Sequence, residues 1–418
     1  MFSKILNTFS TKAGGAIINV IIMIITSRIL GAAGKGEISL FVANLAMIQL
    51  FNNFIGGTSI VYLVPRSSAF QLAIPAYIWA IISCFTSSIA IFYLTGLKEE
   101  YLWHLFFISL LEALMRVHML MLVGKEDIKI HNFISLLQTA LVLMCLLVFF
   151  FMLNEQKVIY YIYSLYVAFT TSYFVAIIFS KNFFNNFSLK GFRTTLKDVV
   201  KIGITAQYSN IITFLNYRLS YYILSKYHGN ESVGVYSNGV SVSEALWMIS
   251  SSIALVQYSK IVNTKNKTYA QQMSVMLAKA CLAITAICLL PLVALPSEFY
   301  VYVLGKDFYE VNKVIMILSP GILAIAVTRI FSHYFGGLGR YHINNYASMA
   351  GLAATIGGGI LLVPAFGITG AALTSTISYL ASSAFLFILF VKDSNTRLQD
   401  FIIKKEDLGM LKEKLKLK

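Results

Sequence analysis

Charged residues are scarce in this sequence of 418 residues. They make up 12% of the chain, whereas 58% of the residues are hydrophobic and the mean hydropathy is +0.74. An ordinary soluble domain is about half apolar and about a quarter charged. Since a soluble core cannot take up this excess of apolar side chains, the composition excludes an ordinary soluble domain and predicts a lipid environment.

Acidic residues are scarcer than basic ones, with 18 Asp and Glu against 33 Lys and Arg and a formal net charge of +15. In a soluble protein this charge would suggest a nucleic-acid partner. Here the basic residues lie in the gaps between apolar runs and near the C-terminus, which leaves no basic face for a nucleic acid. The positive-inside rule of membrane proteins accounts for them better, so we predict no nucleic-acid binding.

The sequence patterns of metal binding and catalysis are missing as well. The cysteines lie inside apolar runs with no CxxC and no nearby histidine, and we expect small core residues: Cys84, Cys145, Cys281 and Cys288. Segment 31–36 lacks the GxxxxGK[ST] spacing of a phosphate loop, and no ATPase domain fits elsewhere. No nucleophile elbow and no pair of loop carboxylates is present. We therefore predict no metal, no cofactor and no enzymatic activity.

Long apolar runs with short polar breaks predict an all-α integral membrane protein. A spanning helix needs about 20 mostly apolar residues. The first run follows Lys4 and Lys12 but has no small-residue cleavage site, so we expect an uncleaved helix. The sequence predicts about twelve transmembrane helices, at 12–30, 38–63, 72–95, 102–123, 131–153, 158–180, 202–225, 234–258, 273–295, 311–336, 343–363 and 369–391.

The distribution of Lys and Arg between alternate loops predicts the orientation. With the N-terminus in the cytoplasm, 22 basic residues lie in inner segments and seven in outer ones. An imbalance of this size predicts that both termini are cytoplasmic, which requires an even number of spans. We expect a multi-pass membrane protein.

The longest polar interval divides the chain into two halves of six spans each. We predict an N-terminal six-helix bundle (1–180), a cytoplasmic linker (181–201), a C-terminal six-helix bundle (202–391) and a basic cytoplasmic tail (392–418). The tail alternates apolar residues with lysines, which fits either an amphipathic helix on the inner leaflet or a solvated tail. Paired halves of this kind are typical of transporters with a central cavity.

Charged residues inside the predicted spans are candidates for function, because each costs about 2.5–3.5 kcal/mol at a helix centre. Glu112 and Arg116 are four residues apart and can pair on one helix face. That pair either holds neighbouring helices together or releases Arg116 to an anionic substrate. Arg28 lies near the outer end of the first span.

Polar residues at helical spacing predict that several spans face a hydrophilic cavity between the halves. The residues placed on these faces are Asn52 in the second span, Asn210 and Arg218 in the seventh, and Glu244 in the eighth. Lys279 and Arg329 lie nearer the cytoplasmic ends, where they either snorkel to the interface or join the cavity. The predicted cavity is cationic overall.

Four short motifs resemble the polysaccharide transporter family, which includes Wzx-type O-antigen flippases, within the multidrug/oligosaccharidyl-lipid/polysaccharide exporter superfamily. They are the Arg-x-Leu-Gly-x-x-Gly-x-Gly motif at 28–36, Leu-Gly-x-x-Phe at 304–308, Gly-Gly-Leu-Gly-Arg at 336–340 and Pro-x-Phe-Gly-Ile-x-Gly-Ala-Ala at 364–372. Position 35 is Lys where the family usually has an aromatic residue, a small departure. The resemblance implies a V-shaped pair of six-helix bundles that turns an undecaprenyl-diphosphate-linked oligosaccharide across the bacterial inner (plasma) membrane.

The physical pattern agrees with this implication. Arginines suit a diphosphate, and polar faces suit sugar hydroxyls. Expected partners are the lipid-linked oligosaccharide, membrane lipids and, as a candidate, polysaccharide polymerase machinery. The alternatives are a multidrug exporter of the same superfamily, a lipid II flippase, and a membrane scaffold for a polymerase.

Overall fold

The computed structural model describes residues 2–95, 98–185, 187, 191–264, 266–394, 396 and 398–401, with side chains from Ser10 onward except that of residue 398. This part of the chain is almost entirely helical and contains no strand, which confirms the predicted all-α fold. Residues 402–418 and Lys190 lie outside the described residues, and with them the predicted tail helix.

Twelve α-helices follow one another along the described chain. They are α1 (Phe2–Gly56), α2 (Thr58–Leu63), α3 (Ala69–Thr95), α4 (Glu99–Gly124), α5 (Ile128–Leu147), α6 (Val158–Ser180), α7 (Phe192–Ala245), α8 (Trp247–Val262), α9 (Lys267–Ala294), α10 (Ser297–Leu304), α11 (Val311–Gly337) and α12 (Tyr341–Ser394). A π-helical turn (Val148–Met152) extends α5, and 3-10 turns occur at Lys181–Phe184, Lys306–Phe308 and Leu398–Phe401.

Nine helical stretches of the described chain are long and apolar enough to cross a membrane. Three of them contain a glycine with non-helical backbone: Gly31 in α1 (φ 66°), Gly229 in α7 (φ 77°) and Gly367 in α12 (φ 54°). A straight helix of 54 residues would be about 80 Å long, far beyond the ~30 Å hydrocarbon core. Each of the three therefore supplies two spans, which gives the twelve predicted spans.

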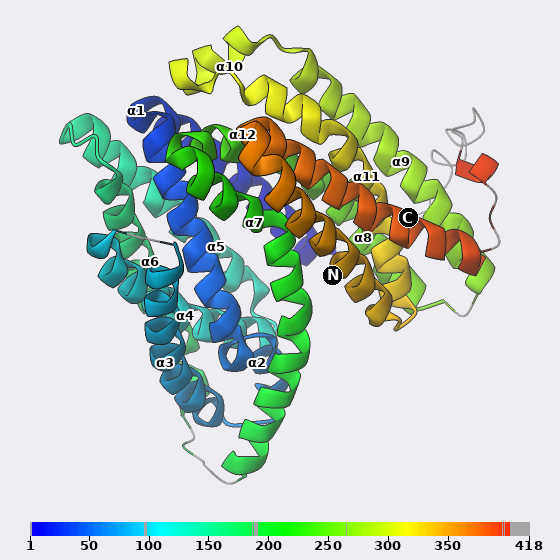
Figure 1. Cartoon of the computed structure of the whole chain (residues 1–418). Coiled ribbons are helices and arrows are strands. Elements are labelled where there is room, and N and C mark those ends of the chain that lie inside the picture. Colours follow the sequence, from blue (N-terminus) through cyan, green and yellow to red (C-terminus); the bar gives the residue numbers. More distant parts are fainter. Residues whose placement is uncertain are drawn as a thin grey trace. The chain divides into compact units, whose positions relative to one another are not determined.

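Contacts along α12 show that the chain reverses at Gly367. Ser378 Oγ donates to the carbonyl oxygen of Gly351 at 3.0 Å, and a Cβ added at Gly370 would lie 2.1 Å from the carbonyl oxygen of Leu362. Positions on the two arms thus pair in antiparallel order. Figure 1 shows α7 and α12 each changing direction part-way along.

The helices form two compact units. The first unit contains the described residues up to Phe214 together with Val303–Asp307, and the second contains Leu215–Tyr302 and the described residues from Phe308 onward. The chain passes from one unit to the other inside the first arm of α7. The domain boundaries predicted from the polar interval stay a prediction.

In the first unit, the predicted outer turns lie together at one end. Glu37 accepts hydrogen bonds from Lys98 Nζ at 3.0 Å and Tyr101 Oη at 3.2 Å, and the hydrogen bond and charge of Glu37 raise the pKa of Lys98. Asp307 Oδ2 accepts from the backbone N–H of Ala32 at 3.0 Å, directly after the Gly31 break. The core between the two ends is apolar and includes Ile48, Leu105 and Phe169.

In the second unit, contacts join helix connections at both ends. At one end, His228 Nε2 on α7 contacts the carbonyl oxygen of Val363 at 2.9 Å, next to the α12 turn. At the other end, Asp393 of α12 contacts residues of the α8–α9 and α11–α12 connections. A stacked pair of rings, Phe331 and Phe390, lies in the core with centroids 4.4 Å apart. Connections predicted on the same side of the membrane thus lie together within each unit.

Candidate functional site

The second unit contains a bidentate ion pair between the two arms of α7. Arg218 Nη1 donates to Glu244 Oε1 at 3.0 Å, and Nη2 donates to Oε2 at 2.9 Å. This fork-to-fork geometry is the most favourable for a guanidinium and a carboxylate. The side chains keep 29% and 17% of their accessible surface, so the pair neutralises two charges inside the predicted spans and is still reachable.

Three aromatic rings lie beside this ion pair. Tyr217 of α7, Trp247 of α8 and Tyr379 of α12 form a triangle with centroid distances of 4.9, 5.7 and 5.8 Å. Arg329 of α11 places its guanidinium carbon 5.4 Å from the centre of the Trp247 ring, within cation–π range. Tyr217 interacts electrostatically with Arg218, Glu244 and Arg329, so the groups belong together. We name these six residues the aromatic–arginine cluster.

The aromatic–arginine cluster carries one uncompensated positive charge. Glu244 neutralises Arg218, whereas Arg329, which is half-buried, makes no ion pair within the described part of the chain. The Trp247 indole N–H is buried and has no acceptor among the described residues. A buried donor without a partner costs about 1–3 kcal/mol. The cluster therefore offers the guanidinium of Arg329 to an anionic ligand.

A buried amide fixes the helices that carry the cluster. Asn216 Nδ2 donates to the carbonyl oxygen of Ser348 at 3.2 Å, and Asn216 Oδ1 accepts from Thr355 at 2.9 Å and Ser378 at 2.8 Å. These bonds join α7 to both arms of α12, one residue before Tyr217. Since the amide is only 6% exposed, it positions the cluster and is not itself a ligand group.

The first unit holds the other predicted ion pair. Arg116 donates through Nε and Nη2 to Glu112 Oε1 at 2.9 and 2.7 Å, as the four-residue spacing predicts. Arg116 keeps 46% of its accessible surface and Glu112 only 10%, so the cation is the accessible partner. His131 interacts electrostatically with Lys12 and Arg116, which makes this a second, separate group of basic residues.

The remaining predicted site residues differ in exposure. Arg28 and Asn210 are exposed, and Asn210 Nδ2 donates to Gln207 at 3.1 Å. Lys279 is half-buried. Asn52 is fully buried and donates to Gln49, which in turn donates to the Ser109 carbonyl oxygen of α4, so it stabilises helix packing in this structure. A role of these residues in substrate binding stays a prediction.

Sequence reasoning did not single out Trp247 and Tyr379. Trp247 follows Glu244 by three residues, and this spacing would place both on one helix face, so a local signal existed. Tyr379 joins the cluster only because α12 reverses at Gly367, and no local pattern encodes that approach.

The sequence matches no protein-family model. No curated protein matches it either. The fold, however, is similar to solved transporter structures. An inward-facing multidrug resistance MATE family transporter of the MOP superfamily aligns with a TM-score of 0.71 at 14% identity, over 91% of this chain and 94% of that one. The lipid II flippase MurJ, in an inward closed conformation, aligns with a TM-score of 0.71 at 13% identity, over 99% and 92%.

A third structure is a MOP superfamily transporter from Pyrococcus furiosus, described as having a binding pocket of reverse polarity. It aligns with a TM-score of 0.64 at 14% identity, over 94% of this chain and 95% of that one. At such identities the similarity establishes the fold. The chain has the multi-pass membrane fold of MOP superfamily transporters, with twelve helices in two bundles.

Proposed function

We propose that this protein is a MOP-type flippase for an undecaprenyl-diphosphate-linked oligosaccharide, such as an O-antigen, capsule or exopolysaccharide repeat unit. The observation that carries the proposal is the uncompensated guanidinium of Arg329 against the Trp247 ring. A lipid-linked diphosphate supplies the anion that this group lacks. The similarity to a lipid II flippase supports a lipid-linked substrate.

In this proposal each side chain of the aromatic–arginine cluster has a distinct task. Arg329 binds a phosphate oxygen by charge-assisted hydrogen bonds. Trp247 and Tyr217 present ring faces to the sugar next to the phosphate. Glu244 holds Arg218 until a phosphate competes for the guanidinium. Arg218 then becomes a second ligand of the phosphate. Arg28 and Arg116 are proposed to contact the substrate elsewhere in the predicted cavity.

Transport is proposed to proceed by alternating access, driven by an ion gradient or by the gradient of the substrate. The six-plus-six arrangement of spans and the lack of a nucleotide motif in the sequence favour this mechanism. The excess of Lys and Arg in alternate loops supports an orientation in the bacterial inner membrane with both termini cytoplasmic.

A multidrug exporter is the main alternative, since MATE transporters share the fold. A cationic drug would need a carboxylate free to bind it. Both carboxylates predicted to face the cavity, Glu112 and Glu244, are paired with arginines here, which disfavours this reading. A lipid II flippase has the same physical requirements as our proposal, and only the identity of the accumulated substrate separates the two.

A deletion strain tests the proposed function. We expect loss of the surface glycan and accumulation of its undecaprenyl-diphosphate-linked precursor, both restored by the wild-type chain. Arg329→Gln should fail to restore export at normal protein abundance, whereas Arg66→Gln, which removes an exposed arginine that binds the Tyr62 carbonyl oxygen, should restore it. Accumulation of lipid II, or drug sensitivity with normal glycan, would contradict the proposal.

A further inference from the structure

A small pocket lies at the end of the second unit that carries the α8–α9 and α11–α12 connections. Its volume is about 190 Å³, and its lining includes the basic residues Lys267 and Arg340, the polar residues Thr264 and Asn266, and the apolar residues Ile261 and Leu338. A water molecule needs only about 10–15 Å³ of such volume, so the pocket has room for a phosphate ester group. It shares no residue with the aromatic–arginine cluster.

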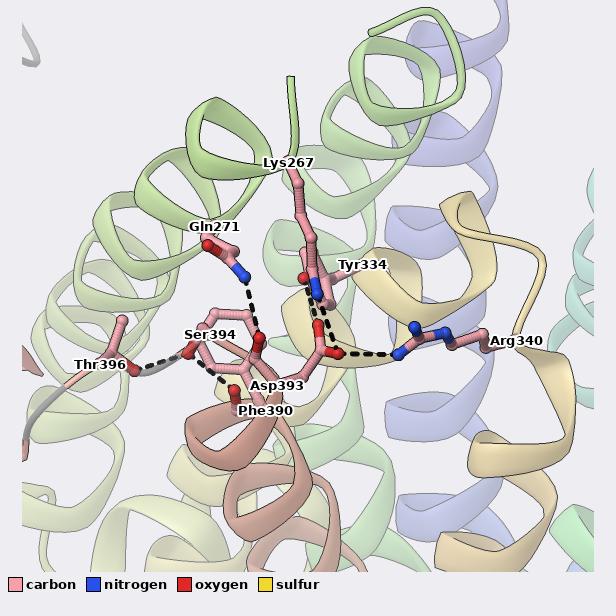
Figure 2. Close-up of polar contacts among 8 residues, drawn as sticks. All are labelled: Lys267, Gln271, Tyr334, Arg340, Phe390, Asp393, Ser394 and Thr396. Carbon is pink, nitrogen blue, oxygen red and sulfur yellow. Dashed lines mark hydrogen bonds and ion pairs between the residues drawn. The ribbon is translucent and has the colours of Figure 1, made fainter. Parts of the chain in front are cut away.

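A single carboxylate holds the two cations of this pocket in place. Figure 2 shows Asp393 between Lys267 and Arg340, and its Oδ1 accepts from Lys267 Nζ at 3.2 Å and from Arg340 Nη1 at 2.8 Å. Because both nitrogens touch one oxygen, they cannot be more than about 6 Å apart. That separation suits two donors to the oxygens of one tetrahedral phosphate.

Asp393 is in turn fixed from two other helices. Tyr334 Oη of α11 donates to its Oδ2 at 2.7 Å, and Gln271 Nε2 of α9 donates to its backbone carbonyl oxygen at 3.0 Å (Figure 2). Asp393 is therefore held in place by side chains of α9 and α11.

The pocket keeps unused donors and a net positive charge. A guanidinium has five N–H donors and an ammonium three, and the structure uses one of each for Asp393. The side chains of Lys267 and Arg340 remain 51% and 44% exposed. Two cations and one carboxylate leave one positive charge facing an open cavity.

We propose that this pocket binds the phosphate headgroup of an anionic phospholipid in the leaflet that the basic loops face. The basic pair suits the phosphodiester, and the apolar wall of Ile261 and Leu338 suits the glycerol and first acyl carbons. Basic pockets between transmembrane helices are suited to such headgroups because the lipid brings its charge to the depth where the helices end. This proposal does not depend on the transported substrate.

Native mass spectrometry of the purified full-length protein tests the proposed binding of an anionic phospholipid, with phosphatidylglycerol and phosphatidylcholine as probes. We expect phosphatidylglycerol to bind and phosphatidylcholine to bind at least tenfold more weakly. The double variant Lys267→Gln/Arg340→Gln should weaken phosphatidylglycerol binding about tenfold or more, since it removes two charge-assisted hydrogen bonds. Lys260→Gln, an exposed lysine at the end of α8 outside the pocket lining, should change it less than twofold.

Asp393→Asn separates binding from a purely structural role of the network. It removes the competing negative charge and keeps the shape, so phosphatidylglycerol should bind as tightly as to the wild type or more tightly. Equal binding by the wild type and the double variant would overturn the proposal, as would weaker binding to Asp393→Asn. Inorganic phosphate that binds as tightly as phosphatidylglycerol would assign the pocket to a free anion and overturn the lipid as its ligand.

Discussion

Arg218 and Arg329 lie in one cluster, yet their charges are compensated differently. Arg218 has a carboxylate in bidentate contact, whereas Arg329 has an aromatic face. A cation–π contact is worth about 0.5–2 kcal/mol, which does not replace the solvation of a charge within a membrane. The cost of burying Arg329 is therefore lowered most by an anionic ligand, and this is why we propose that the cluster binds an anionic substrate.

A double-mutant cycle measures the coupling between the side chains of Arg218 and Glu244. Arg218→Gln and Glu244→Gln should each destabilise the protein, because each leaves a partly buried charge without its partner. We expect a coupling free energy of about 1–3 kcal/mol, measured from the free energy of unfolding of the purified protein in detergent.

The pair Lys98–Glu37 is the matched control for this cycle. Its side chains are 58% and 22% exposed, and such pairs contribute about 0–1 kcal/mol. A coupling at Arg218–Glu244 no larger than at this control would contradict a desolvated, bidentate pair in the second unit.

At the scale of elements, glycines decide where the long helices reverse. Gly229 and Gly367 adopt φ of 77° and 54°, and a Cβ at Gly367 would lie 3.3 Å from the His228 ring. Substitution by alanine should cost about 1–3 kcal/mol of unfolding free energy at either position from backbone strain. The loss at Gly367 should be at least as large as at Gly229, where a Cβ would meet no atom of the described chain within 4 Å.

Gly357 provides the control of opposite sign. It lies inside a helical arm of α12, and a Cβ there would also meet no described atom within 4 Å. The substitution Gly357→Ala should stabilise the protein by up to about 1 kcal/mol, because glycine is a poor helix former. Thermal unfolding in detergent measures all three variants. Equal effects at the three positions would contradict the assignment of Gly229 and Gly367 to chain reversals.

The sequence predicted the elements well and their assembly less well. Apolar runs and small-residue turns predicted twelve spans, because length and hydropathy are local properties. The predicted spans 311–336 and 343–363 agree closely with α11 and the first arm of α12. The short helix α10 lies in a predicted outer segment. It was not predicted as a helix, because eight residues are too few for a periodic signal. The approach of Tyr379 to Trp247 depends on packing between helices and has no local signal.

At the scale of the whole molecule, the orientation in the membrane rests on the distribution of Lys and Arg. Single-cysteine labelling tests it, after the four native cysteines are replaced by alanine. Lys98→Cys lies in a predicted outer segment and Arg66→Cys in a predicted inner one, and both native residues are exposed. A membrane-impermeant maleimide added to intact cells should label the first and not the second. The reverse pattern would invert the topology.

We propose that the protein moves a lipid-linked, anionic saccharide without ATP. Purified protein in liposomes with a fluorescent undecaprenyl-diphosphate-linked oligosaccharide measures this directly, with and without imposed proton or sodium gradients. We expect flipping in the absence of ATP, at a rate that falls about tenfold or more in Arg329→Gln, since one charge-assisted hydrogen bond to phosphate is lost. Arg66→Gln should flip at the wild-type rate. Flipping that requires ATP, or that is equal in wild type and Arg329→Gln, would contradict it.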